Sequence, residues 1–125
     1  MKRLFIILSI ILLINSYYAN SQIEYSVDKW MEYVEELALE TEDTERIESL
    51  YADLSYLIEH PFDLNAVTEE QLKRLPFLSD RQIEQLLSYR KRYGNMVSIY
   101  ELKNIEDIDF QTISLLLPFV YIGDN

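Results

Sequence analysis

The sequence predicts an all-α protein, and three observations support that prediction. The 125 residues include only 2 Gly and 3 Pro, which is too few for the many tight turns of a β-sandwich or β-barrel. Apolar residues make up 49% of the chain, and they recur three and four positions apart, as on one face of a helix. Polar residues of the kind that cap helices stand in front of several of these apolar stretches. A chain of this length corresponds to one small domain.

The first 21 residues are predicted to form a signal peptide. Two basic residues precede an almost uninterrupted apolar stretch at residues 4–14. This stretch is shorter than the roughly 20 residues that span a bilayer, and it has the length of a signal-peptide core. Ala19-Asn20-Ser21 offers small residues at the two positions that a signal peptidase reads, so Gln22 is the expected first residue of an exported protein. The alternative is an uncleaved N-terminal anchor.

Residues 22–60 predict an acidic pair of amphipathic helices. Two apolar stripes at helical spacing, at about residues 26–39 and 47–58, flank an acidic segment at residues 40–45. Two amphipathic helices with so short a connection form an antiparallel hairpin. Residues 23–60 hold twelve acidic and two basic residues. This charge is interpreted either as a solvated outer face or as an acidic docking surface.

Two similar units follow at residues 61–122. In each unit a capping box opens a short helix, a tight turn follows, and a longer helix begins at a polar cap. The capping boxes are Thr68-Glu69-Glu70-Gln71 and Ser98-Ile99-Tyr100-Glu101, and the turns lie at about residues 76–79 and 106–109. The longer helices are expected to end at Tyr93, where Gly94 provides a left-handed C-cap, and before Pro118.

One pattern runs through both units and consists of the following segments: Asp63-Leu64-Asn65-Ala66, Glu69-Glu70-Gln71-Leu72, Leu75-Pro76-Phe77-Leu78-Ser79, Tyr89-Arg90, Tyr93-Gly94, Ser98-Ile99-Tyr100-Glu101-Leu102 and Leu117-Pro118-Phe119-Val120. This pattern resembles the tandem helix-hairpin-helix domain of exported, ComEA-like competence DNA receptors. The whole chain resembles the N-terminal region of larger exported helix-hairpin-helix proteins of Bacteroidetes-type bacteria. The resemblance implies an acidic helical hairpin followed by a tandem helix-hairpin-helix domain. It also implies the periplasm or cell envelope of a Gram-negative bacterium, and sequence-nonspecific binding of double-stranded DNA.

The glycines of that family are missing from both turns. In the family, a Gly-hydrophobic-Gly turn holds a DNA phosphate on the backbone N–H groups at a helix N-terminus. The four corresponding positions of this chain hold other residues: Phe77, Ser79, Asp107 and Asp109. The apolar residue in the middle of each turn is kept. Both turns are therefore expected to pack onto their own domain, although the phosphate site is altered.

The altered turns predict different behaviour for the two units. The second turn, Asp107-Ile108-Asp109, is predicted not to bind DNA because its two carboxylates repel phosphate. The first turn together with the start of the helix after it, Phe77-Leu78-Ser79-Asp80-Arg81, remains a candidate for contact with a phosphate, through the N–H groups of residues 79–81, or with a protein partner. Further basic residues lie nearby, and they either complement helix dipoles or contact phosphate: Lys73, Arg74, Arg90, Lys91 and Arg92.

Phe77 is expected at the exposed tip of its turn, where an aromatic ring requires a cover. One cover is intramolecular, with the acidic helix pair folding back so that Phe77 packs against Trp30, Tyr33 or Tyr51. The other is a partner surface that Phe77 enters as an aromatic anchor.

The composition excludes most catalytic chemistry. The chain has one His and no Cys, and its neighbouring carboxylates point in different directions on a helix, so neither a catalytic site nor a metal or cofactor site is expected. The net charge of −11 disfavours general binding of nucleic acid. We expect a non-catalytic interaction or scaffold module with an unknown protein partner. Weak, nonspecific binding of duplex DNA is the alternative. A small-molecule substrate is not expected, and membrane contact is expected only through the signal peptide before cleavage.

Overall fold

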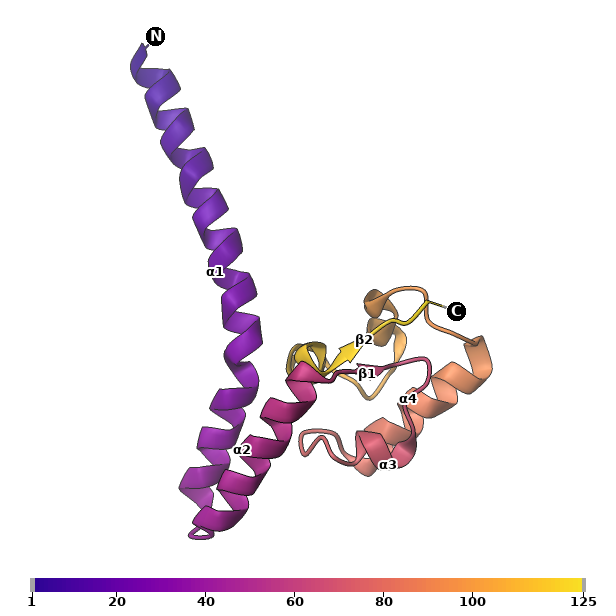
Figure 1. Ribbon diagram of the computed structural model, residues 1–125. Helices are drawn as coiled ribbons and strands as arrows, with labels where there is room; N and C mark the ends of the chain where they lie inside the picture. The colour runs from indigo at the N-terminus through magenta and orange to yellow at the C-terminus, as the bar shows by residue number, and fades with distance from the viewer. Residues whose placement is uncertain (1, 125) are drawn as a thin grey trace.

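The structure is a computed structural model that describes the backbone of residues 2–124 and the side chains of residues 2–12 and 29–124. It confirms the all-α class, because the described backbone forms seven helices and almost no strand. Figure 1 shows a pair of helices, α1 (Lys2–Glu40) and α2 (Thr44–Glu59), beside a smaller bundle formed by the later elements.

Helix α1 is longer than the sequence predicts. The apolar stripe indicated a helix at about residues 26–39, whereas α1 extends over Lys2–Glu40 and includes the segment predicted as a signal peptide. The first 60 residues contain no Gly or Pro, so the local sequence has nothing to break the helix. The side chains of the predicted cleavage site, Ala19-Asn20-Ser21 and Gln22, lie outside those described. Within the described residues, no helix has both the length and the apolar character needed to cross a membrane.

Helix α2 returns alongside α1, as predicted for a helical hairpin (Figure 1). Its start is fixed by Asp43, whose side chain accepts a hydrogen bond of 3.0 Å from the backbone N–H of Arg46. Trp30 of α1 is 2% exposed and lies between Tyr51 of α2 and Phe119 of the bundle, at ring-centroid distances of 5.4 and 6.1 Å. The helix pair therefore packs onto the rest of the protein through an aromatic cluster.

The bundle contains two units of the same design. The first consists of α3 (Glu69–Leu72) and α4 (Asp80–Tyr93), and the second of the 3-10 helix η1 (Ile99–Asn104) and α5 (Phe110–Leu116). Both predicted capping boxes are present, one at the start of α3 and one at the start of η1. The five buried apolar pairs, each 30 residues apart and no more than 8% exposed, are Leu72 and Leu102, Leu75 and Ile105, Leu78 and Ile108, Ile83 and Ile113, and Leu86 and Leu116.

The two longer helices end where the sequence predicts, at Tyr93 and before Pro118, and only details of their caps differ. Gly94 caps α4 with φ of 80°, which confirms the positive φ, but its ψ of −162° is extended rather than left-handed helical. Helix α5 ends at Leu116, before Pro118 as expected, and the 3-10 helix η2 (Leu117–Phe119), which contains this proline, follows directly. Pro is tolerated there because it lies in the first turn of η2, where its missing N–H is not needed.

A short parallel pair of strands, which the sequence did not predict, joins the two ends of the bundle. Strand β1 (Phe62–Asp63) pairs with β2 (Val120–Tyr121), with Phe62 opposite Val120. The Asp63 carboxylate also accepts a hydrogen bond of 2.9 Å from the N–H of Gly123. Residues at the start and end of the repeated region are thus held side by side.

Candidate functional site: the two turns

The two turns between the helices of each unit have the same backbone design. The first turn (residues 75–79) is closed by a hydrogen bond from the Leu78 N–H to the Leu75 carbonyl at 3.2 Å. The second turn (residues 105–109) has the equivalent bond from Ile108 to Ile105 at 3.1 Å. Leu78 and Ile108 are 8% and 4% exposed, which confirms that the apolar middle residues pack inward. The turns are therefore structurally matched even though their flanking residues differ.

Ser79 and Gln82 close the first turn onto α4. The Ser79 hydroxyl accepts a hydrogen bond of 3.1 Å from the Gln82 N–H, and Gln82 Oε1 accepts one of 2.9 Å from the Ser79 N–H. This is a complete capping box, and it uses the first of the three N–H groups predicted to face a phosphate. The N–H groups of Asp80 and Arg81 lie in the first turn of the helix, where no intrahelical acceptor exists.

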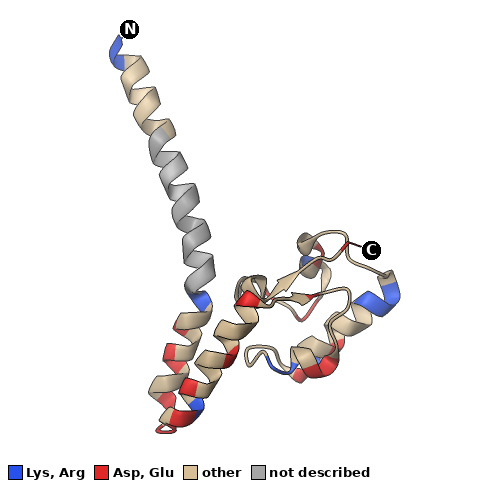
Figure 2. Cartoon of the chain, in the orientation of Figure 1, with Lys and Arg blue, Asp and Glu red and all other residues tan. Residues whose placement is uncertain are grey.

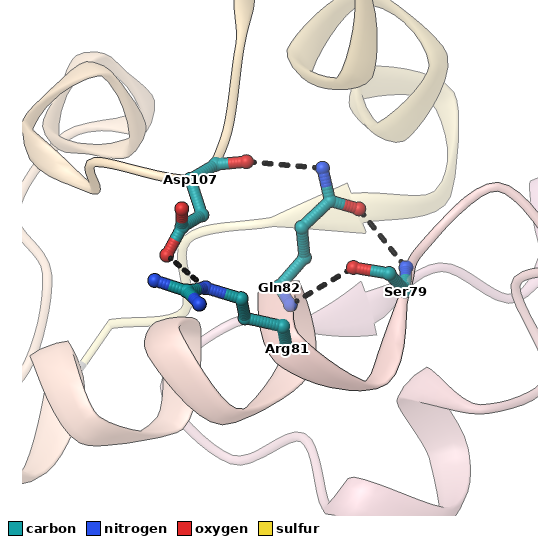
Figure 3. A network of polar contacts seen from close by, with 4 residues as sticks. All are labelled: Ser79, Arg81, Gln82 and Asp107. Atoms are coloured by element: carbon teal, nitrogen blue, oxygen red, sulfur yellow. Dashed lines mark hydrogen bonds and ion pairs between the residues drawn. The ribbon is translucent and has the colours of Figure 1, made fainter.

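Gln82 also ties the first turn to the second. Its Nε2 donates to the Asp107 carbonyl at 3.1 Å and to the Thr112 hydroxyl at 3.3 Å. Figure 3 shows the amide of Gln82 lying between Ser79 on one side and Asp107 on the other. Gln82 and Thr112 occupy equivalent positions in the two units, so the starts of α4 and α5 face each other across this amide.

Arg81 forms an ion pair with Asp107 of the second turn. Its Nε lies 3.0 Å from Asp107 Oδ2, with the arginine side chain 75% exposed and the aspartate 27% exposed (Figure 3). The hydrogen bond from Arg81 to Asp107 and the charge of that carboxylate raise the pKa of the guanidinium above its ordinary value. The cation nearest the first turn is thus neutralised by an acid from the second.

Asp109 caps helix α5. Its carboxylate accepts a hydrogen bond of 2.8 Å from the Thr112 N–H, which provides the polar cap that the sequence predicts at the start of this helix. The hydrogen bonds from Thr112 lower the pKa of Asp109, so this carboxylate is held in its charged form. A fixed negative charge therefore stands where a phosphate would approach the second helix N-terminus.

The structure corrects the expectation that Phe77 is exposed at the tip of its turn. Phe77 is partly buried, with its ring 6.1 Å from that of Tyr33 and 5.7 Å from that of Phe119. The Tyr33 hydroxyl also donates to the Pro76 carbonyl at 3.2 Å. Burial, and then the charge of Glu40, raise the pKa of Tyr33. The cover is therefore intramolecular, and α1 provides it.

The basic residues proposed as phosphate contacts are mostly engaged within the protein. Arg90 Nη1 donates to the carbonyls of Leu64 at 3.0 Å and Val67 at 2.8 Å, so its guanidinium supports the chain before α3. Lys73 pairs with Glu69 at 3.5 Å.

The remaining predicted bases lie on the surface. Lys91 shares a shallow surface hollow with Lys73 and with three acids, Glu69, Asp80 and Glu84. The Arg92 guanidinium lies 5.4 Å from the centre of the Tyr93 ring, and Arg74 is exposed in the turn after α3.

Gln82 is a site residue that sequence reasoning missed, although a signal for it exists. Ser79-Asp80-Arg81-Gln82 has a hydroxyl residue followed three positions later by Gln, which is the capping-box pattern. The contact of Gln82 with the second turn has no such local signal, because it joins positions 25 residues apart.

Among the side chains at residues 2–12 and 29–124, no three His, Cys, Asp or Glu residues come together as a metal site would require. The single His60 stacks on Tyr56 at a ring-centroid distance of 4.3 Å, and its Nδ1 lies 3.1 Å from the Tyr56 carbonyl. It serves as the C-cap of α2.

Comparison of the chain with protein-family models, with curated proteins and with solved structures finds no match. Its function is therefore inferred from the contacts of the two turns and from the distribution of charge.

Proposed function

We propose that this chain is a non-catalytic, exported interaction or scaffold module of helix-hairpin-helix design whose DNA-phosphate site has been lost. The observation that supports it best is the ion pair between Arg81 and Asp107, at 3.0 Å. A phosphate at the first turn would have to compete with a carboxylate that already holds the nearest cation.

The two carboxylates of the second turn also oppose the binding of phosphate. A phosphate about 8 Å from Asp107 or Asp109 is repelled by roughly 0.5–2 kcal/mol per carboxylate at an effective dielectric constant of 20–80, before salt screening. A single hydrogen bond from a backbone N–H to phosphate contributes a similar amount. Binding at either turn therefore gains little or nothing overall.

The proposed lack of a catalytic role follows from how the reactive groups are used. His60 caps a helix and stacks on Tyr56, and the carboxylates with lowered pKa values, Asp109 and Glu101, each cap a helix start. These groups are explained by local structure, because His60 donates to carbonyls at the end of α2 and the two carboxylates accept from N–H groups at helix starts.

Extracytoplasmic, nonspecific binding of duplex DNA is the second candidate function. It is favoured by the matched design of the two turns and by the N–H groups of Asp80 and Arg81, which have no intrahelical acceptor. The two functions differ in the affinity they require, so one titration distinguishes them.

The test is a titration of a labelled DNA duplex with the mature protein, which is expected to begin at Gln22. Binding is followed by fluorescence anisotropy at about 150 mM salt. We expect binding no tighter than about 10⁻⁴–10⁻⁶ M, without dependence on DNA sequence. Asp107→Gly should tighten binding, because it frees Arg81 and removes one repulsive charge. Glu59→Gln, which removes the same charge at the end of α2, is the matched control and should have a smaller effect. Submicromolar binding by the unmodified protein would contradict the proposal.

A further inference from the structure

A groove with an apolar floor lies between α1 and α2, on the helix pair. It has a volume of about 500 Å³ and is lined by Met31, Val34, Glu35, Ala38, Ile47, Glu48 and Tyr51. We call these residues the acidic groove. Five of them are apolar or aromatic, and the other two are carboxylates, so the groove combines an apolar surface with negative charge.

The apolar side chains of the acidic groove are accessible and held in place. Met31 is 36% exposed and Tyr51 is 47% exposed, whereas Val34 at the floor is 4% exposed. The Tyr51 ring packs against buried Trp30 at a centroid distance of 5.4 Å. A ring fixed in this way loses little freedom when a partner covers it, which favours binding.

The surroundings of the groove are strongly acidic. Residues 29–60 include ten acidic residues against Lys29 and Arg46. Figure 2 shows these acids distributed over both helices of the pair. A partner that fits this surface has positive charge beside exposed apolar groups.

The end of α4 has that chemistry. Lys91 and Arg92 are exposed in its last turn, Tyr93 follows them with 62% exposure, and Val97 lies just beyond with 89% exposure. We call these four residues the basic tip. Contacts with Tyr89, at a ring-centroid distance of 4.7 Å, and with Arg92 position the Tyr93 ring.

We propose that the basic tip of one copy docks into the acidic groove of a second copy, in a head-to-tail arrangement. This inference rests on the proposed function, for which it names the partner. Figure 2 shows the acidic helix pair and the blue end of α4 at opposite sides of the molecule, so the tip does not reach its own groove. Because the two faces differ, such contacts form a ring or an open chain of copies. The patch is small, so we expect weak, concentration-dependent association that salt suppresses.

Sedimentation equilibrium of the processed protein tests this proposal. At low salt, the average mass should rise with protein concentration, and at about 300 mM salt it should return towards that of the monomer because charges are screened. A monomer mass at low salt, at every protein concentration up to roughly 1 mM, would overturn the proposal.

Charge reversal provides a sharper test. The groove variant, Glu35→Lys with Glu48→Lys, and the tip variant, Lys91→Glu with Arg92→Glu, should each be monomeric alone. All four residues are exposed, so the melting temperature should be nearly unchanged. An equal mixture of the two variants should associate again. The groove variant still has a basic tip, and the tip variant still has an acidic groove into which that tip can dock. A mixture that stays monomeric would contradict head-to-tail docking.

The controls apply the same charge changes elsewhere. Glu59→Lys with Asp124→Lys matches the groove variant, and Lys73→Glu with Arg74→Glu matches the tip variant. Both controls should associate like the unmodified protein. If they also become monomeric, net charge and not docking governs association, and the proposal is wrong. If the protein does not self-associate, the docking proposal fails, but an interaction function with another partner stays in place. Submicromolar DNA binding would contradict the interaction function itself, whatever the result of the association experiments.

Discussion

Gln82 and Asp107 are joined by a hydrogen bond of 3.1 Å, from the side-chain amide of the first unit to the backbone carbonyl of the second turn. The oxygen of the same Gln82 amide accepts a hydrogen bond from the Ser79 N–H. One side chain therefore completes a helix cap and connects the two turns. The space between the two turns is thus crossed by the protein's own polar contacts.

Gln82→Ala should destabilise the fold by roughly 1–2 kcal/mol, because it removes a capping contact and leaves the Asp107 carbonyl without this donor. The expected fall in melting temperature is about 4–8 °C per kcal/mol for a domain of this size. Gln85→Ala, the same change one turn later on α4, is the control and should shift the melting temperature by much less. Equal effects of the two substitutions would show that the bridge contributes nothing.

Phe77→Ser should lower the free energy of unfolding by about 1.5–3 kcal/mol, because Phe77 packs between Tyr33 and Phe119. The measurement is thermal or urea unfolding followed by circular dichroism. Phe110→Ser is a matched control, because Phe110 is 74% exposed at the start of α5 and should tolerate the change. An unchanged unfolding midpoint for Phe77→Ser would mean that α1 does not cover the first turn in solution.

Glu101→Gln should flatten the acid side of the stability profile. Hydrogen bonds from the N–H groups of Val97 and Ser98 lower the pKa of Glu101 below its ordinary value of 4.5. A group whose pKa is lower in the folded state stabilises the protein above its unfolded pKa, and this stabilisation is lost as the pH falls through the folded value. The stabilisation that Glu101 provides is therefore lost at pH values from about 4.5 downward.

A glutamine at this position should preserve the cap, since Gln71 performs the same task with Thr68 in the first unit. Melting temperatures between about pH 2 and 7 would show the effect as a smaller loss in the variant than in the unmodified protein. Glu70→Gln, which removes a carboxylate at the start of α3, controls for the change in net charge. If the variant loses stability with the same pH dependence as the unmodified protein, the capping contact of Glu101 does not contribute to the acid response.

Protein purified from its native host should begin at Gln22, because the apolar stretch at residues 4–14 and Ala19-Asn20-Ser21 match a cleavable signal peptide. Intact-mass analysis of the soluble and membrane fractions measures this directly. A mass that includes residues 1–21, found in the membrane fraction, would support the uncleaved anchor instead.

The local parts of the fold could be predicted from the sequence. The capping boxes at Thr68 and Ser98, and the N-cap at Asp109, depend on residues three positions apart, so a short pattern identifies them. The inward packing of the apolar middle residues of the two turns, Leu78 and Ile108, was also predicted, and both are buried. Where the local sequence has no stop signal, as in the first 60 residues, the extent of a helix could not be predicted.

The contacts that define the candidate site could not be predicted in the same way. Arg81 pairs with Asp107, and Arg90 donates to the carbonyls of Leu64 and Val67, across separations of 23–26 residues. Such pairs depend on how the two units are packed, and charge patterning along the chain does not encode that packing. A base near a turn could therefore be identified, but its partner could not.

The parallel pairing of β1 with β2 determines how the domain responds to tension. A pull that enters through α2 and leaves through the C-terminal end acts along both strands in opposite directions, so it loads their hydrogen bonds in shear. The bond from the Leu64 N–H to the Tyr121 carbonyl at 2.9 Å and the contact of Gly123 with Asp63 then resist together, and they do not open one after another. The two helical units lie within the loop that these strands close, and they experience no extension until the strands separate.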